Sequence, residues 1–92
     1  VGRVVALYVQ HAPQLLNAVL VTDAADNEAL AEAAHALKSL SRNIGAVRVG
    51  NLCDSIETAA RSGQASGALD RLEAAVLATL TALDATPAAR AA

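Results

Sequence analysis

The sequence predicts an all-α protein, folded as an antiparallel up-down-up-down four-helix bundle. The chain has 92 residues, which is the size of one small domain. Hydrophobic residues make up 54% of it, but Ala alone supplies 24 positions and Tyr8 is the one aromatic, so the core must be built from small, helix-favouring side chains. Apolar residues also recur every three or four positions in four stretches with short connections.

The first stretch runs from about Gly2 to Val21, and its spacing predicts a helix with one apolar face. Pro13 lies inside it, so we expect either a kink or a break with Pro13 in the first turn of a new helix. Residues 22–27 have the composition of a turn, in which Asp26 or Asn27 can cap the next helix. The apolar face consists of Val5, Tyr8, Ala12, Leu15, Leu16 and Val19.

Three further helices are predicted. The second covers about Glu28–Ile44 and should end at Gly45, in the left-handed conformation that glycine favours. The third covers about Val47–Arg61, and a turn at 62–64 separates it from the fourth, at about Ser66–Leu83. We expect residues 1–84 to form the bundle and residues 85–92, which contain Pro87 and no apolar face, to form a flexible tail. The predicted core includes Leu37, Ile44, Leu52, Ile56, Leu72, Val76 and Leu80.

Composition disfavours several classes of function. Seven Lys and Arg against nine Asp and Glu leave no basic excess for nucleic-acid binding. No membrane contact is expected, because no run of about 18 apolar residues is free of polar breaks. The single Cys53 can form neither an internal disulfide nor a cysteine-cluster metal site, and it is predicted to be a small buried hydrophobe. No glycine-rich phosphate loop is present, which gives no means of binding ATP.

His35 does not fit the core of the second helix. With Leu37 at the centre of the buried face, His35 falls about 160° away at 100° per residue. It is therefore predicted to be exposed. No metal site is expected there, because Glu28, Glu32 and His35 lack a second histidine or a cysteine. The other residues on this face are Ala31, Ser39 and Arg42, with Lys38 on its flank.

An exposed imidazole can act as a nucleophile near neutral pH, because a useful fraction of it is uncharged. Lys38, three residues on, can reach a phosphoryl group attached to His35 and stabilise its charge. Ser39 could meet His35 one turn away, but no third member of a catalytic triad is evident. The plainer interpretation is an ordinary surface histidine beside solvated basic side chains.

The residues from Ala34 to Ala46, which read AHALKSLSRNIGA, resemble the histidine-containing phosphotransfer (HPt) domain. That family typically has Ala-His-x-Leu-Lys-Gly, then small and polar residues, then Leu or Ile, Gly and Ala. The pairs Leu52-Cys53 and Ile56-Glu57 match the next helix of the family, and Ala12-Pro13 matches the helix before. One departure is Ser39, where the family usually has the Gly that leaves room for a partner.

The resemblance implies that His35 accepts a phosphoryl group from the aspartyl phosphate of a receiver domain and passes it to the aspartate of another. Lys38 would stabilise the phosphoryl group, and the small Ser39 would allow the receiver to approach. The chain would hydrolyse no ATP and hold no cofactor, with Mg²⁺ on the receiver. It would act in the cytoplasm as a monomer, either as the C-terminal module of a hybrid sensor histidine kinase, which can be tethered to the inner membrane, or as a stand-alone relay protein.

In-line transfer requires close approach, so we expect the receiver to dock around His35 on the second and third helices. Two alternatives are a helical protein-interaction module in which His35 is incidental, and a dimerising histidine kinase domain. The second commonly has an acidic residue directly after its histidine, where this chain has Ala36. The predicted partner-binding residues are Ala31, Glu32, Arg42, Asn51 and Ser55.

Overall fold

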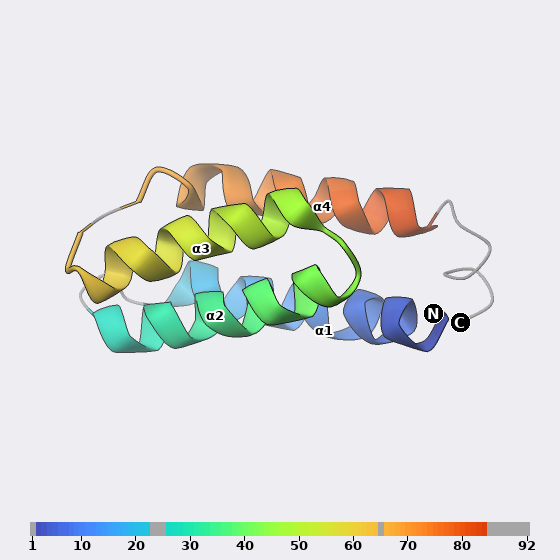
Figure 1. The fold of residues 1–92 in the computed structure, drawn as a ribbon, viewed down its shortest axis with the longest axis horizontal. Coiled ribbons are helices and arrows are strands. Elements are labelled where there is room, and N and C mark those ends of the chain that lie inside the picture. The colour runs from blue at the N-terminus through green and yellow to red at the C-terminus, as the bar shows by residue number, and fades with distance from the viewer. Residues whose placement is uncertain (1, 23–25, 65, 85–92) are drawn as a thin grey trace.

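The structure, a computed structural model, describes residues 2–22, 26–64 and 66–84. These residues form the helices α1 (Gly2–Val21), α2 (Asn27–Asn43), α3 (Val47–Arg61) and α4 (Leu69–Asp84). Figure 1 shows α1 and α3 running in one direction, and α2 and α4 in the other. Both α1 and α3 contact α2 and α4, so antiparallel neighbours close into a ring. This arrangement confirms the predicted four-helix bundle. The expected tail, 85–92, lies outside the described residues.

Helix α1 is continuous through Pro13. Of the two expected alternatives, a kink or a break, the break therefore does not occur within residues 2–21. Pro13 is exposed, and the ring therefore faces away from the core. Proline removes one N–H donor from the helical ladder. On a solvent-facing side the carbonyl that loses its partner can bond to water instead, which allows the helix to continue.

The start and end of α2 follow the predicted capping residues. The Asp26 side chain accepts a hydrogen bond from the Ala29 N–H (3.1 Å), as an N-cap does. Gly45 has φ +78°, its N–H donates to the Arg42 carbonyl (3.1 Å), and the Ala46 N–H donates to the Ser41 carbonyl (2.9 Å). This is a Schellman motif, and its left-handed residue explains the glycine.

Helix α4 begins at Leu69, three residues later than the sequence pattern predicts. The Leu69, Asp70 and Arg71 N–H groups donate to carbonyls three residues back. Such tighter turns commonly precede an α-helix. Ser66 accepts a hydrogen bond from the Ala68 N–H (3.1 Å), so the polar start of this stretch forms a turn instead of a helix.

The core lies along the bundle axis and contains the predicted apolar faces. Leu37, Ile56, Leu72 and Val76 are buried as expected. Ile44, Leu52 and Leu80 are partly buried and pack against that core, so these three lie at its edge. The core also contains a polar contact that joins α1 to α2, in which the hydroxyl groups of Tyr8 and Ser41 are 3.0 Å apart.

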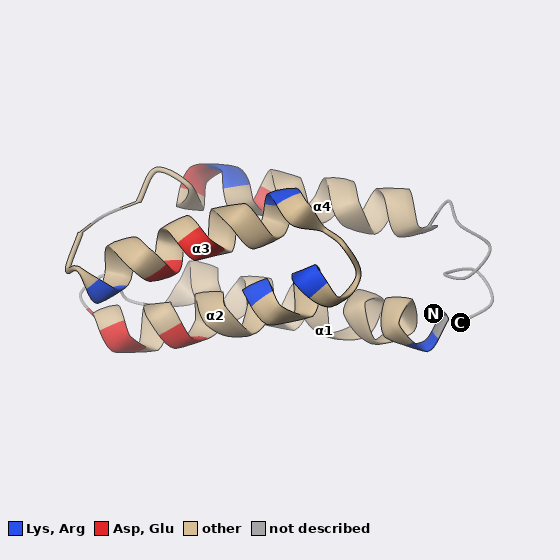
Figure 2. Cartoon of the chain, viewed as in Figure 1, with Lys and Arg blue, Asp and Glu red and all other residues tan. Residues whose placement is uncertain are grey.

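Charge is distributed unevenly among the helices. Figure 2 shows that most positions occupied by basic and acidic residues lie on α2, on α3 and at the start of α4. Helix α1 carries none from Val4 to Val21, and Arg3–Val21 is long and apolar enough to cross a membrane by length and composition alone. The stretch is interrupted by polar residues, among them Gln14 and Asn17. In the bundle, this helix buries Tyr8, Ala12 and Val19 against its neighbours.

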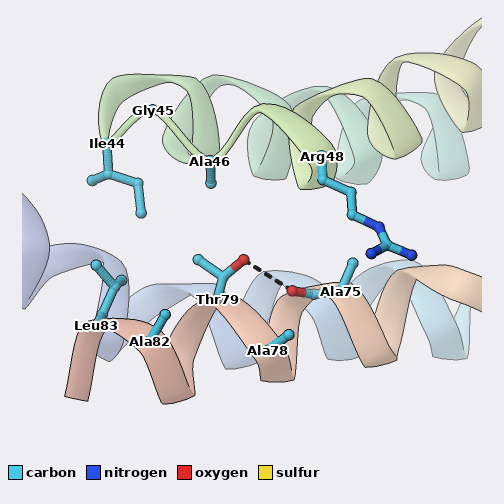
Figure 3. A pocket seen from close by; sticks show the side chains of 9 residues that line it. All are labelled: Ile44, Gly45, Ala46, Arg48, Ala75, Ala78, Thr79, Ala82 and Leu83. Carbon is cyan, nitrogen blue, oxygen red and sulfur yellow. Dashed lines mark hydrogen bonds between the residues drawn. The ribbon is translucent and has the colours of Figure 1, made fainter. Parts of the chain in front are cut away.

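A shallow hollow of about 340 Å³ lies between the α2–α3 turn and α4. Figure 3 shows small side chains lining it, with Arg48 at one end. The Thr79 hydroxyl donates to the Ala75 carbonyl within its own helix (2.9 Å). The hollow is therefore lined mostly by alanine and other apolar groups, and His35 is not among its lining residues.

Candidate functional site

The site is formed where α2 and α3 run antiparallel to each other. His35 contacts Glu57, and Lys38, one turn later on α2, contacts Asp54, one turn earlier on α3. One further turn along, a Cβ atom on Gly50 would lie 3.1 Å from Cγ of Arg42, so Gly50 leaves the space in which the Arg42 side chain lies. The close packing of these helices thus brings side chains far apart in the sequence onto one surface.

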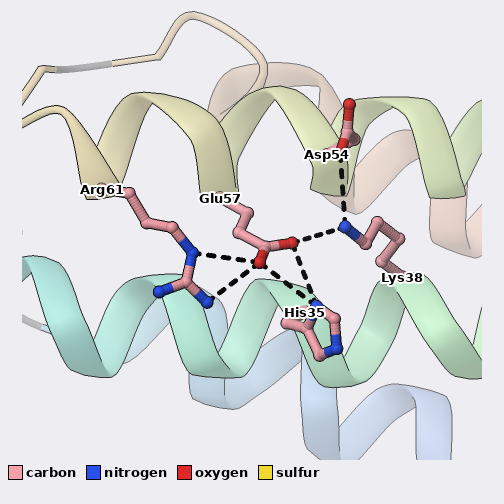
Figure 4. A network of polar contacts seen from close by, with 5 residues as sticks. All are labelled: His35, Lys38, Asp54, Glu57 and Arg61. Carbon is pink, nitrogen blue, oxygen red and sulfur yellow. Dashed lines mark hydrogen bonds and ion pairs between the residues drawn. The ribbon is translucent and has the colours of Figure 1, made fainter.

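His35 is exposed in the middle of α2, as the helical wheel predicts, with 57% of its side chain accessible. Its Nδ1 atom lies 3.2 Å from each oxygen of the Glu57 carboxylate. An ionised carboxylate only accepts hydrogen bonds, so a neutral His35 carries its proton on Nδ1. Figure 4 shows the other ring nitrogen on the side of the ring away from Glu57.

Glu57 is the centre of a group of five polar side chains, which we call the Glu57 network. Its side chain is 11% exposed, although it carries a charge. Lys38 Nζ donates to Oε1 (2.6 Å), while Nε and Nη2 of Arg61 donate to Oε2 (3.2 and 3.0 Å). The network consists of His35, Lys38, Asp54, Glu57 and Arg61.

These contacts keep Glu57 ionised. The hydrogen bond from Lys38 is the main cause that lowers the pKa of Glu57 to about 2, and the hydrogen bonds from Arg61 and His35 act in the same direction. Partial burial opposes this effect, because it disfavours the charged form. The carboxylate is therefore a fixed negative charge beside the His35 ring near neutral pH.

Lys38 is not the solvated surface charge that the plainer interpretation expects. Only 14% of its side chain is accessible, and Nζ also donates to Asp54 (3.3 Å). The hydrogen bond to Glu57 is the main cause that raises the pKa of Lys38, so the ammonium group stays charged. Lys38 is thus held one turn from His35, in a position from which it can approach the ring.

The residues of α2 predicted to bind a partner differ in their exposure. Glu32, Ser39 and Arg42 are exposed along the His35 side of the helix. The prediction for Ala31 is wrong, because this residue has 0% accessibility and belongs to the core. Ala31 lies one turn before His35 on α2, and Arg61 lies one turn after Glu57 on the antiparallel α3, so the register of these two helices accounts for its burial.

Asn51 and Ser55 of α3 are exposed. The α3 side chain that contacts His35 is instead Glu57. Ser55 lies about 160° around the helix from Glu57, on a side turned away from α2. Sequence reasoning assigned no role to Asp54, Glu57 or Arg61. The Ile56-Glu57 pair of the family resemblance was the available signal for Glu57; the other two depend on the packing of α2 against α3.

Two other kinds of chemistry find little support at this surface. Among the described residues, no group of three or more His, Cys, Asp or Glu side chains could hold a metal ion. Cys53 is buried, as predicted, and burial is the main cause that raises the pKa of its thiol to about 12. The reactive thiolate is therefore suppressed.

A comparison with protein families identifies this arrangement. A family model described as the Hpt domain matches residues 3–86, which include all of α2 and α3. Comparisons with curated proteins and with solved structures give no match. Hpt domains are helical modules that interact with receiver domains. The chain therefore belongs to the Hpt domain family, the histidine phosphotransfer modules of two-component phosphorelays.

Proposed function

We propose that His35 is the phosphoacceptor and that its Nε2 atom is the nucleophile. It takes a phosphoryl group from the aspartyl phosphate of one receiver domain and passes it to the aspartate of another. The observation that carries this proposal is the contact between Nδ1 of His35 and the Glu57 carboxylate (3.2 Å) on an otherwise exposed ring. It holds the proton on Nδ1 and leaves the lone pair of Nε2 free to attack.

The step balances without an added acid or base. An N–P bond forms at Nε2 while the acyl P–O bond of the aspartyl phosphate breaks, and the aspartate leaves with the electron pair. The ring keeps its Nδ1 proton and gains one positive charge, which faces the negative charge of Glu57. Stabilisation of charge that develops during a reaction is an effective means of catalysis. The transfer to the second receiver is the reverse of this step.

Lys38 stabilises the transferred group. Its ammonium group is three residues from His35 and is directed by Glu57 and Asp54 toward the same side of α2. A phosphoryl group on Nε2 provides three acceptor oxygens for it. The chain needs no cofactor of its own in this proposal, and Mg²⁺ acts from the receiver.

The receiver docks over the exposed side of α2. Ser39 lies one turn after His35 and is small, so a partner backbone can come close to the ring. Glu32 and Arg42, also exposed, provide one charge of each sign at the two ends of this surface. Asn51 of α3 is exposed as well and is the α3 residue that we assign to this surface.

The same chemistry serves either chain context, a module of a hybrid sensor histidine kinase or a stand-alone relay protein, because the reacting residues all lie in α2 and α3. We propose that the domain acts as a cytoplasmic monomer. Sedimentation of the isolated domain at increasing concentration tests the monomer, and a mass that rises toward twice that of the chain would contradict it.

The decisive experiment mixes the domain with a phosphorylated receiver from the same organism and follows acid-labile, base-stable label. The His35→Gln variant should take up no label while its helical content and melting temperature stay near those of the original. His11→Gln, on α1, is the matched control and should be labelled normally. Label that persists in His35→Gln would exclude His35, and a domain that binds receivers without becoming labelled would support an interaction module instead.

A further inference from the structure

We propose that Arg61 is a positioning residue, which holds the Glu57 carboxylate against His35 while Lys38 is engaged with the phosphoryl group. This inference rests on the proposed function. It assigns different roles to the two cations that contact Glu57, one that moves during the reaction and one that stays.

The geometry separates the two cations. Lys38 donates to Oε1 of Glu57, and Arg61 donates to Oε2 through two nitrogens. Figure 4 shows them approaching the carboxylate from opposite sides, with His35 between them. Each oxygen therefore has its own cation, and removal of one cation leaves the other oxygen still bound.

Lys38 moves from Glu57 to the phosphoryl group once His35 is phosphorylated. It shares α2 with His35, at a spacing that brings the two side chains together. A phosphoryl group on Nε2 adds strong acceptor oxygens and negative charge within its reach. Lys38 then gives up its 2.6 Å contact with Oε1, and Glu57 loses one of its partners at the moment when the ring is charged.

Arg61 remains bound to Glu57 during the transfer. It lies four residues after Glu57 on the same helix, so the pair does not depend on the position of α2. The planar guanidinium makes two hydrogen bonds to one oxygen, which fixes the direction as well as the distance. Figure 4 shows Arg61 on the far side of the Glu57 carboxylate from Lys38. The Nδ1–H contact of His35 can thus persist through the reaction.

An exposed ion pair within one helix is often only a stabilising feature, and such a role would change the melting temperature alone. The test therefore follows the Nδ1 proton of His35 by ¹H–¹⁵N NMR. Phosphoramidate labels histidine without a receiver: Nε2 forms the N–P bond, the donor P–N bond breaks and ammonia leaves. The unchanged protein should show a slowly exchanging Nδ1 proton before and after labelling.

Arg61→Gln should keep this resonance before labelling, because Lys38 still holds Glu57, and should lose it afterwards. Arg61→Lys should restore it in the labelled state, and Arg71→Gln, on α4, should behave as the unchanged protein. A labelled Arg61→Gln that keeps the resonance would overturn the proposal, as would one that lacks it before labelling. Label found on His35→Gln would instead overturn the proposed function.

A second set of variants needs no phosphoryl group. In Lys38→Gln, Arg61 is the remaining cation on Glu57, and the Nδ1 resonance should be retained. In the double variant of Lys38→Gln and Arg61→Gln it should be lost. Retention in the double variant, at unchanged helical content, would show that neither cation positions Glu57.

Discussion

Glu57 and His35 are 22 residues apart in the chain, yet the carboxylate oxygens of one lie 3.2 Å from Nδ1 of the other. Because Glu57 is also bound by Lys38 and Arg61, it is a fixed charge rather than a mobile surface group. The exposed histidine of this bundle is thus oriented from below by a nearly buried acid. The acid determines which ring nitrogen faces the solvent, and its negative charge would stabilise a positive charge on the ring.

Replacement of this acid should slow phosphoryl transfer. Glu57→Gln keeps an acceptor oxygen but removes the charge that faces the ring, and we expect the transfer rate to fall by about ten- to a hundredfold. Rapid-quench measurement with a phosphorylated receiver gives the rate. Glu73→Gln, at an exposed position on α4 away from the docking surface, is the control and should stay within about twofold. A Glu57→Gln variant as fast as the original would remove Glu57 from the mechanism.

The same residue should make stability depend on pH in the acid range. The pKa of Glu57 falls from an ordinary 4.5 to about 2 in the folded protein. A lowered pKa stabilises the fold above pH 4.5, and this contribution is lost as the pH falls toward 2. Urea unfolding at pH values from 6 to 2 should therefore show a smaller loss of stability in Glu57→Gln than in the original protein. Equal slopes in the two proteins would contradict the assigned contacts.

Access to His35 should depend on a small residue at position 39. Ser39→Trp should prevent a receiver from docking while leaving the fold intact, because the position is exposed. Lys38→Ala should instead slow transfer with a milder effect on receiver affinity, since its role is electrostatic. Calorimetry and transfer assays separate the two effects. Near-normal transfer by a folded Ser39→Trp variant would mean that the receiver approaches from another side.

The bundle should be sensitive to truncation at the centre of α2. Leu37 has 0% accessibility, and Leu37→Ala should lower the free energy of unfolding by about 2–5 kcal/mol. Leu77 is 53% exposed on α4, and Leu77→Ala should change it by less than about 0.5 kcal/mol. Urea titrations of both variants make the comparison. Similar losses at the two positions would show that the core is placed wrongly.

The hydroxyl pair of Tyr8 and Ser41 should behave as one unit. Each hydroxyl is buried and has the other as its partner at 3.0 Å. Tyr8→Phe or Ser41→Ala alone leaves a buried polar group without it, which destabilises by about 1–3 kcal/mol. The double variant should lose less than the sum of the single losses, by about 0.5–3 kcal/mol of coupling. Strictly additive losses would show that the contact contributes nothing.

Much of the fold could be predicted from the sequence, because its determinants are local. The period of apolar residues predicts α1 and α3 at their observed bounds, and Asp26 and Gly45 mark the ends of α2 within one residue. The start of α4 was predicted three residues early, since apolar spacing does not distinguish a helix from the tighter turn that precedes it.

The exposure of His35 also followed from local geometry, since a residue opposite the apolar face of an amphipathic helix faces the solvent. The burial of Ala31 could not be predicted in this way, because Ala31 lies only about 40° from the exposed His35 on the same helical wheel. A helical wheel describes one helix alone and contains no information on where a second helix packs. Helix α3 covers the Ala31 side of α2 and leaves His35 accessible, and that difference depends on where α3 packs.

The sequence by itself determined the helices, the core and the exposed histidine, because these depend on residues within a few positions of one another. The tertiary structure decided which acid contacts His35, which oxygen each cation binds and which ring nitrogen is free. Those relationships depend on the relative position of α2 and α3 to within a hydrogen-bond length. No periodicity within one helix specifies that position; it is set by the packing of side chains from all four helices around the shared core.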